Sequence, residues 1–309
     1  GTPRTPRRST PARNASERAR RRAAAAYIVP FLVLFALVMV APIGYALWTS
    51  LFKEESAGLG FGGTESVFVG LGNYTDALGD PALRDAFLHI AAYVALYVPL
   101  MTCAALLLAL LLDSAAARAK RLLQLALFLP YTVPTVIAAI IWVYLYSPSL
   151  SPVMDWFGAV GLSVDFFSAP MAVPAVVNIV TWHYVGYNMV ILYAALQAIP
   201  RETLEAATMD GAGAIRTALR IKVPHIRPAL VLSLLFTCVG AVQLFNEPYM
   251  LTTQSEGVNR DWSPVMFVHK AAFVDHQQGL ASAAAILIAL LAGALSYAVT
   301  ALGNRWKAA

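Results

Sequence analysis

The chain has 309 residues, of which 59% are hydrophobic and only 13% charged, and its mean hydropathy is +0.65. Soluble domains carry about 25% charged residues, and a single soluble core stops growing near roughly 250–300 residues. The composition therefore excludes an ordinary soluble domain, and also a disordered chain or a disulfide scaffold. It predicts a protein that is partly solvated by lipid.

The formal charge of +5 is unevenly distributed along the chain. Residues 1–22 hold eight arginines and one glutamate, whereas the rest of the chain has 14 basic and 16 acidic residues. Because the excess of positive charge is confined to one end, a nucleic-acid-binding face is not expected. We interpret residues 1–24 as a basic, disordered cytoplasmic tail that helps to fix orientation.

Six apolar runs follow this tail, and each is long enough to cross a bilayer. They are 25–50, 86–112, 122–146, 171–197, 229–253 and 279–303. About 25 helical residues extend roughly 37 Å, more than the ~30 Å of the hydrocarbon core. Glu247 is the only Asp, Glu, Lys or Arg in all six runs. The sequence therefore predicts an all-α polytopic membrane protein with six transmembrane helices.

The loops between the runs predict the orientation of the chain. The segments 1–24, 113–121, 198–228 and 304–309 together hold 18 of the 22 basic residues. Positively charged loops stay in the cytoplasm, so both termini are expected inside. The first run with its outer loop then covers 25–85, the main transmembrane domain covers 86–303, and residues 304–309 form a short cytoplasmic tail.

The longest cytoplasmic loop, 199–228, is the most informative segment. Pro200 can begin a helix over 201–210, and the Gly-Ala-Gly at 211–213 interrupts it. A second short helix is expected over 214–220, ending before Val223-Pro224 because proline disfavours helical geometry in the preceding residue. Such an exposed, bent helix pair could lie on the anionic inner leaflet or dock against another protein.

The residues of this loop resemble a known signature. Glu-Ala-Ala at 205–207, Asp-Gly-Ala at 210–212 and Ile-Lys-Val-Pro at 221–224 are similar to the EAA loop of permeases of binding-protein-dependent ABC importers. Further segments resemble sugar permeases of the maltose and glycerol-3-phosphate type, in particular the first permease of a heterodimeric pair. These segments are Val69–Tyr74, Asp80-Pro81, Leu129–Thr135 and Leu196–Pro200.

The resemblance implies the type I ABC importer permease fold and a coupling role for the loop. Glu205 would make a charged contact with a separate ATPase, and Gly211 would supply the bend. The residues implied in coupling are Glu205, Ala206, Ala207, Asp210, Gly211, Ala212, Ile221, Val223 and Pro224. The implied partners are a second permease subunit, two cytoplasmic ATPase subunits, an extracytoplasmic solute-binding protein and the lipid of the bacterial inner membrane.

The chain has no G-x-x-x-x-G-K-[ST] phosphate loop, so ATP and magnesium are expected on the partner ATPase. No catalytic residue, metal ligand or cofactor is expected in this chain. The alternative is a secondary transporter that carries a small neutral solute on its own. Such a transporter usually needs ionisable groups within the membrane, and the runs offer only Glu247.

The resemblance also implies which residues face the solute, expected to be a sugar or a sugar-like compound. They are Tyr131, Thr135, Tyr184, Thr237, Gly240, Ala241 and Leu244. The last four share one helical face by their spacing, and Tyr and Thr offer uncharged hydrogen bonds. The structural alternatives are that Tyr184 belongs to a belt of aromatic residues at the membrane interface and that Gly240 and Ala241 allow close helix packing.

Several other polar residues in the runs remain open between a role in the pathway and a structural one. Asn188, Gln243 and Asn246 could equally hydrogen-bond between helices, whereas His89 and His183 are interpreted as hydrogen-bonded residues of the runs. Glu247, the one acid in the runs, is a functional candidate, but it lies near the outer end of the fifth run, where we expect a solvated carboxylate. Cys103 and Cys238 sit in apolar runs and are expected to behave as small hydrophobic residues. After the fifth run the chain reads Thr-Thr-Gln-Ser-Glu-Gly at 252–257, where the family often has Thr-Gly-Gly-Gly-Pro.

Overall fold

The structure is a computed structural model that describes residues 11–56, 64–114 and 119–308. It is mainly helical. From the N-terminus the elements are α1 (Pro11–Phe35), the π-helix η1 (Ala36–Val40), α2 (Ala41–Thr49), β1 (Phe52–Ser56), β2 (Thr64–Phe68), α3 (Gly72–Gly79), α4 (Pro81–Asp113), α5 (Lys120–Phe128), the 3-10 helix η2 (Leu129–Thr132), α6 (Thr135–Tyr146) and α7 (Pro152–Ala159). The second half contains η3 (Ala169–Met171), α8 (Ala172–Gln197), α9 (Arg201–Met209), α10 (Ala214–Thr217), the π-helix η4 (Ala218–Lys222), α11 (Val223–His225), α12 (Arg227–Val242), α13 (Asn246–Leu251), α14 (Pro264–Phe273) and α15 (Gln278–Ala308).

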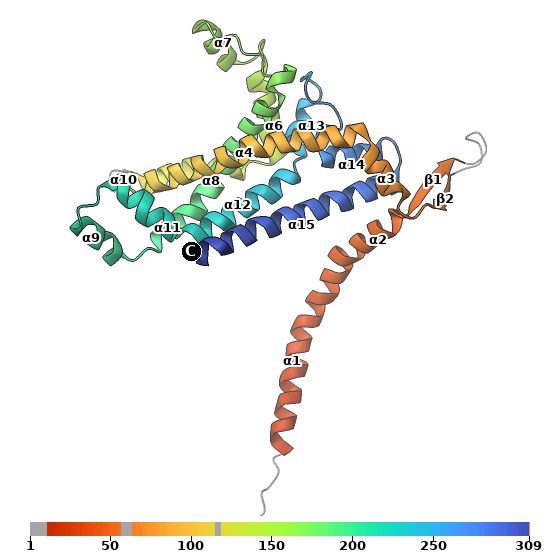
Figure 1. Cartoon of the computed structure of the whole chain (residues 1–309), viewed down its shortest axis with the longest axis horizontal. Helices are drawn as coiled ribbons and strands as arrows, with labels where there is room; N and C mark the ends of the chain where they lie inside the picture. Colours follow the sequence, from red (N-terminus) through yellow and green to blue (C-terminus); the bar gives the residue numbers. More distant parts are fainter. Residues whose placement is uncertain (1–10, 57–63, 115–118, 309) are drawn as a thin grey trace, which may run out of the picture.

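The core of the molecule is formed by α4, α8, α12 and α15, which run side by side (Figure 1). Helices α4 and α8 make the most extensive contact. In one part of it Tyr93, Tyr97 and Met101 pack against residues of α8, and in another Ala105 and Ala109 pack against Leu192. Both layers are apolar, as expected for packing by van der Waals contact inside a membrane.

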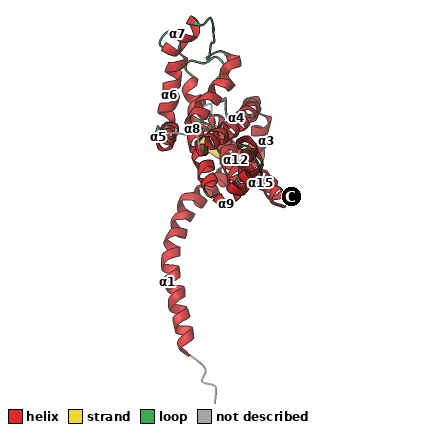
Figure 2. Ribbon diagram, turned by 90° about the vertical axis from the view of Figure 1, so that its left-hand side faces the viewer, coloured by secondary structure: helices red, strands yellow, loops and turns green. Residues whose placement is uncertain are grey.

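The N-terminal helices stand apart from this core. Figures 1 and 2 show α1 leaving the bundle in both views. The segment Ala23–Thr49 is long and apolar enough to cross a membrane, yet the most hydrophobic part of it has no buried residue. Residues 11–24, which we expected to belong to a disordered tail, are the first turns of α1, because alanine and arginine favour helix. Residues 1–10 of that tail lie outside the described residues.

Four helices are long and apolar enough to cross a membrane, and up to six if each of two bent helix pairs counts as one span. The first pair bends by 97° between Thr132 and Thr135, around Val133-Pro134. The second bends by 71° at Ile226, between the loop 199–228 and α12. The predicted run 229–253 is not one helix, because α12 ends at Val242 and α13 begins only at Asn246.

A small two-stranded hairpin, which the sequence did not predict, accompanies the expected helices. Strands β1 and β2 pair antiparallel, with Phe52 opposite Phe68 and their rings 5.4 Å apart. Asn73 from the Val69–Tyr74 segment is buried, and its Nδ2 donates to the carbonyls of Ser50 and Phe52, at 2.8 and 2.7 Å. This motif therefore ties the end of α2 to α3.

The same end of the molecule is closed by α14 and the loop before it. Lys270 Nζ lies 2.9 Å from Asp261 Oδ2 and 4.0 Å from Asp275 Oδ2. The hydrogen bond to Asp261 raises the pKa of the Lys270 ammonium. The hairpin, α3 and α14 lie at one end of the bundle, and α9–α11 lie at the other, beside the C-terminus (Figure 1).

Candidate functional site

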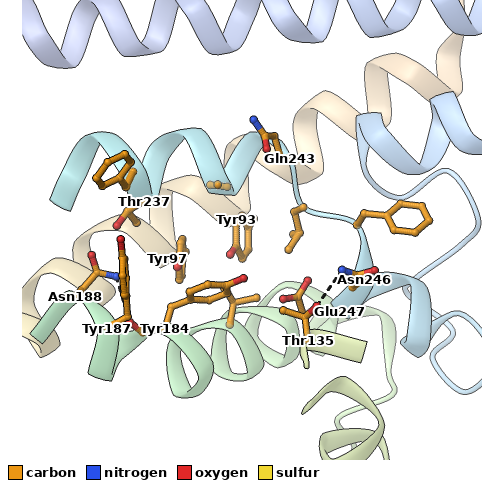
Figure 3. A pocket seen from close by; sticks show the side chains of 16 residues that line it. Tyr93, Tyr97, Thr135, Tyr184, Tyr187, Asn188, Thr237, Gln243, Asn246 and Glu247 are labelled. Atoms are coloured by element: carbon orange, nitrogen blue, oxygen red, sulfur yellow. Dashed lines mark hydrogen bonds between the residues drawn. The ribbon is translucent and has the colours of Figure 1, made fainter. Parts of the chain in front are cut away.

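A cavity of about 240 Å³ lies among α4, α8, α12, α13 and the first residue of α6 (Figure 3). Its wall is rich in tyrosine and uncharged polar groups. The lining residues are Tyr93, Tyr97, Thr135, Val180, Tyr184, Tyr187, Asn188, Phe236, Thr237, Gly240, Ala241, Gln243, Leu244, Phe245, Asn246 and Glu247. Aromatic rings and hydroxyls can together stack on and hydrogen-bond a small polar solute.

The structure brings together six of the seven residues that we expected to face the solute. Thr135, Tyr184, Thr237, Gly240, Ala241 and Leu244 all line the cavity. Tyr131 does not line it, because the chain turns at Pro134 and leaves Tyr131 in η2, outside the wall. Its ring instead stacks on Tyr187 at 4.7 Å and meets Tyr184 edge-on at 5.9 Å.

The end of α12 shapes the cavity. No atom of the described residues lies within 4 Å of where a Cβ of Gly240 would be, so no other helix of this chain packs closely against this glycine. The three residues after Val242 leave the helix, and Ser263 Oγ donates to the freed carbonyl of Leu244 at 2.8 Å. Asn246 Nδ2 then donates to Thr135 Oγ1 at 3.1 Å, which joins α13 to α6.

Glu247 corrects an expectation. We expected a solvated carboxylate, but the residue is only 5% exposed and lines the cavity. The reason is the break after Val242, because α13 packs against α6 instead of extending the line of α12. In Figure 3 Glu247 lies between Tyr184 and Asn246.

Sequence reasoning missed the contribution of α4. Tyr93 and Tyr97 line the cavity, and their rings stack at 4.9 Å. The available signal was their spacing of four residues, which places both on one face of the second apolar run. Tyr187, three residues after Tyr184, was missed in the same way.

The remaining polar residues divide between structural and cavity positions. Asn188 accepts from Ser233 Oγ at 2.6 Å, which links α8 to α12. His89 Nδ1 lies 3.2 Å from the carbonyl oxygen of Trp262, as expected, whereas His183 Nδ1 has no partner among the described residues. Both cysteines are free, and no cluster of three or more metal-ligating side chains occurs in the described ranges.

The loop 199–228 forms a second candidate site. Helix α9 ends at Met209, and Gly211 adopts a φ of +74°, which turns the chain as predicted. Ala207 is buried, while Glu205, Ala206 and Asp210 are exposed. Three large apolar side chains of the same loop are also exposed, with Met209 at 89%, Ile215 at 77% and Leu219 at 59%. Such a surface is unusual for a loop in water and is typical of a contact surface.

The second helix of the loop is longer than predicted. We expected it to end before Val223-Pro224, but the π-helix η4 and helix α11 carry the helical backbone on to His225. A wider π turn also precedes Ala41-Pro42, at η1. In both places the wider turn makes room for a proline ring, which would clash with a carbonyl in a regular α-helix.

A polar cluster connects this loop to the bundle. Lys222 from η4 pairs with Asp113 at the end of α4, and both side chains are largely buried. Gln197 Nε2 at the end of α8 donates to the other carboxylate oxygen of Asp113 at 2.6 Å. The loop is therefore held to the ends of two long helices by a single carboxylate.

Comparison with known proteins gives a consistent result. Residues 105–307 match the family described as "Binding-protein-dependent transport system inner membrane component". The trehalose transport system permease protein SugA of Mycobacterium tuberculosis is 31% identical over 281 residues, which cover 89% of this chain and 87% of that protein. The sn-glycerol-3-phosphate transport system permease protein UgpA of Salmonella typhimurium is 33% identical over 215 residues, 69% of this chain and 71% of that protein.

The fold is also similar to that of solved structures. A chain of a bacterial ABC transporter that imports the acidic polysaccharide alginate superposes with a TM-score of 0.79 at 19% identity. The match covers 95% of this chain and 99% of that chain. At this identity the likeness concerns the fold.

Proposed function

We propose that this chain, which belongs to the binding-protein-dependent transport system inner membrane component family, forms half of the translocation pathway of an ATP-driven sugar importer. A second permease subunit completes the pathway, and a solute-binding protein delivers the solute. Two separate ATPase subunits bind ATP and magnesium. The loop 199–228 couples them to the transmembrane helices.

The observation that carries this proposal is the geometry of the loop. Exposed apolar side chains lie on both helical parts of the loop, and Gly211 turns the chain between them. The Lys222–Asp113 pair ties the same loop to α4 and, through Gln197, to α8. A force applied to the loop by an ATPase would therefore reach two helices that line the cavity. Coupling requires that the loop can adopt two conformations and that the ATPase favours one of them.

The membrane arrangement follows from the loop charges and the helix ends. We infer six spans with both termini in the cytoplasm. The C-terminal end of α15 lies at the same end of the bundle as α9–α11 (Figure 1), and the basic loops agree with this side. The exposed apolar helices α1 and α2 would then contact lipid and the second permease.

A sugar is the solute class that fits both the relatives and the cavity. SugA is named for trehalose and UgpA for sn-glycerol-3-phosphate, so polyhydroxyl solutes recur among the relatives. The tyrosine-rich wall offers rings for stacking and hydroxyls for hydrogen bonds.

Purification from native membranes in mild detergent tests this proposal. An ATPase with a phosphate loop and a second permease carrying an EAA loop should copurify in stoichiometric amounts. A chain that purifies alone, and still transports solute in liposomes without ATP, would instead establish a secondary transporter.

A further inference from the structure

We propose that Glu247 and Tyr93 form a subsite that binds hydroxyl groups of an uncharged solute and excludes anionic ones. The inference rests on the proposed importer function and adds the charge class of the solute. Neither residue was among the positions expected to face the solute. They come from α13 and α4 and are 154 positions apart in the chain, yet both line the same cavity (Figure 3).

The first observation is the environment of the Glu247 carboxylate. The residue is nearly fully buried, and within the described part of the chain its carboxylate accepts a hydrogen bond from its own backbone N–H but pairs with no Lys, Arg or His. A buried carboxylate is costly unless it is paired or hydrogen-bonded. Its two oxygens can accept several hydrogen bonds, and adjacent hydroxyls of a sugar are suitable donors.

The second observation concerns Tyr93 and is independent of the first. Its side chain is fully buried, and its hydroxyl has no hydrogen-bond partner among the described residues. An unsatisfied buried hydroxyl is disfavoured, and native proteins usually provide a partner for it. A solute hydroxyl in the cavity would be that partner. The Tyr97 ring, stacked on Tyr93, holds the Tyr93 ring in place.

The charge of the wall decides which solutes can enter. None of the cavity's lining residues in this chain is Lys, Arg or His, so the wall offers no cation to an anionic solute, and Glu247 is its one acidic residue. Two negative charges repel strongly where water is excluded. A phosphate or carboxylate on the solute would therefore be rejected next to Glu247. We therefore expect this chain to reject sn-glycerol-3-phosphate and alginate, the anionic solutes for which one relative and one structural neighbour are named.

The test measures uptake in the source bacterium, so that all partner subunits are present. The gene is deleted and replaced by wild type, Glu247→Gln or Tyr93→Phe. Uptake is measured with radiolabelled trehalose and maltose as neutral probes, and with sn-glycerol-3-phosphate and an alginate trisaccharide as anionic ones. Matched controls are Glu54→Gln on the exposed part of β1 and Tyr297→Phe on α15, which is 78% exposed. Membrane abundance and copurification of the partners are measured for every variant.

We expect wild type to take up a neutral probe and not the anionic ones. Glu247→Gln should raise the apparent KM for the neutral probe about tenfold, and Tyr93→Phe several-fold, because each removes a hydrogen bond to the solute. Glu247→Gln should also reduce the difference in uptake rate between neutral and anionic probes. A purely structural role of Glu247 would not produce this effect. Tyr93→Phe removes one oxygen atom and keeps the packing, so it provides the test if Glu247→Gln does not reach the membrane.

Three results would overturn the inference. Unchanged KM and selectivity in variants of normal abundance would leave the importer function standing and remove the subsite. The subsite would also be removed, with the importer function left standing, if the wild type took up the anionic probes as fast as the neutral ones. Uptake of no probe above the deletion strain would overturn the proposed sugar import itself, and the subsite with it.

Discussion

At the scale of single residues, Gly186 is the point where α8 comes closest to α5. A Cβ built at this position would lie 1.9 Å from the carbonyl oxygen of Leu127, which is backbone and cannot rotate away. We expect Gly186→Ala to lower the free energy of unfolding by about 1–3 kcal/mol. Thermal unfolding of the protein in detergent measures this. Gly293→Ala on α15, where no atom lies within 4 Å, is the control and should cause no loss.

The coupling role of the loop is also testable at single residues. Proline requires a φ near −65°, so Gly211→Pro cannot keep the observed +74°, and Glu205→Ala removes the exposed charge. We expect the double variant to insert normally and to lose uptake at least tenfold, while ATP hydrolysis no longer responds to the loaded binding protein. Glu202→Ala, exposed on the same helix, is the control. Unchanged uptake in the double variant would contradict coupling through this segment.

At the scale of elements, the Asp113–Lys222 pair joins the loop to α4. We expect Asp113→Asn and Lys222→Gln each to weaken the stimulation of ATP hydrolysis by loaded binding protein, because each leaves a largely buried charge without its partner. The double variant Asp113→Lys with Lys222→Asp, which exchanges the two charges, should recover part of the stimulation of ATP hydrolysis. The exposed pair Lys53–Asp76 provides the control, since its exchange should have little effect. Equal stimulation in all variants would exclude a mechanical role for the pair.

At the scale of the whole molecule, the arrangement in the membrane gives a prediction of orientation. In a background with Cys103→Ala and Cys238→Ala, we expect Thr253→Cys to react with an impermeant maleimide on intact cells. Thr208→Cys on α9 should react with the maleimide only after the membrane is permeabilised. Both positions are exposed, so accessibility within the protein does not limit the reaction. The reverse pattern of labelling would invert the proposed topology.

The sequence by itself determined the features that depend on local chemistry. Four helical segments are long and apolar enough to cross a membrane, and they lie within a few residues of predicted runs: Ala23–Thr49, Pro81–Asp113, Ala169–Gln197 and Gln278–Ala301. The reason is that an apolar run long enough to cross a bilayer is a property of adjacent residues. The end of α9 and the turn at Gly211 followed from helix propensity and from the permissive backbone of glycine.

Only the tertiary structure decided which residues line the cavity and how the chain runs around it. Tyr93 and Glu247 line the same cavity because α4 packs on α8 and because α12 ends at Val242, and neither arrangement is encoded in a local pattern. The hairpin depends on pairing across the loop, and the helix through Pro224 depends on a π turn. Packing between distant segments determines each of these features. Burial of Glu247 is the clearest case, since the same carboxylate at the end of a straight helix would face water.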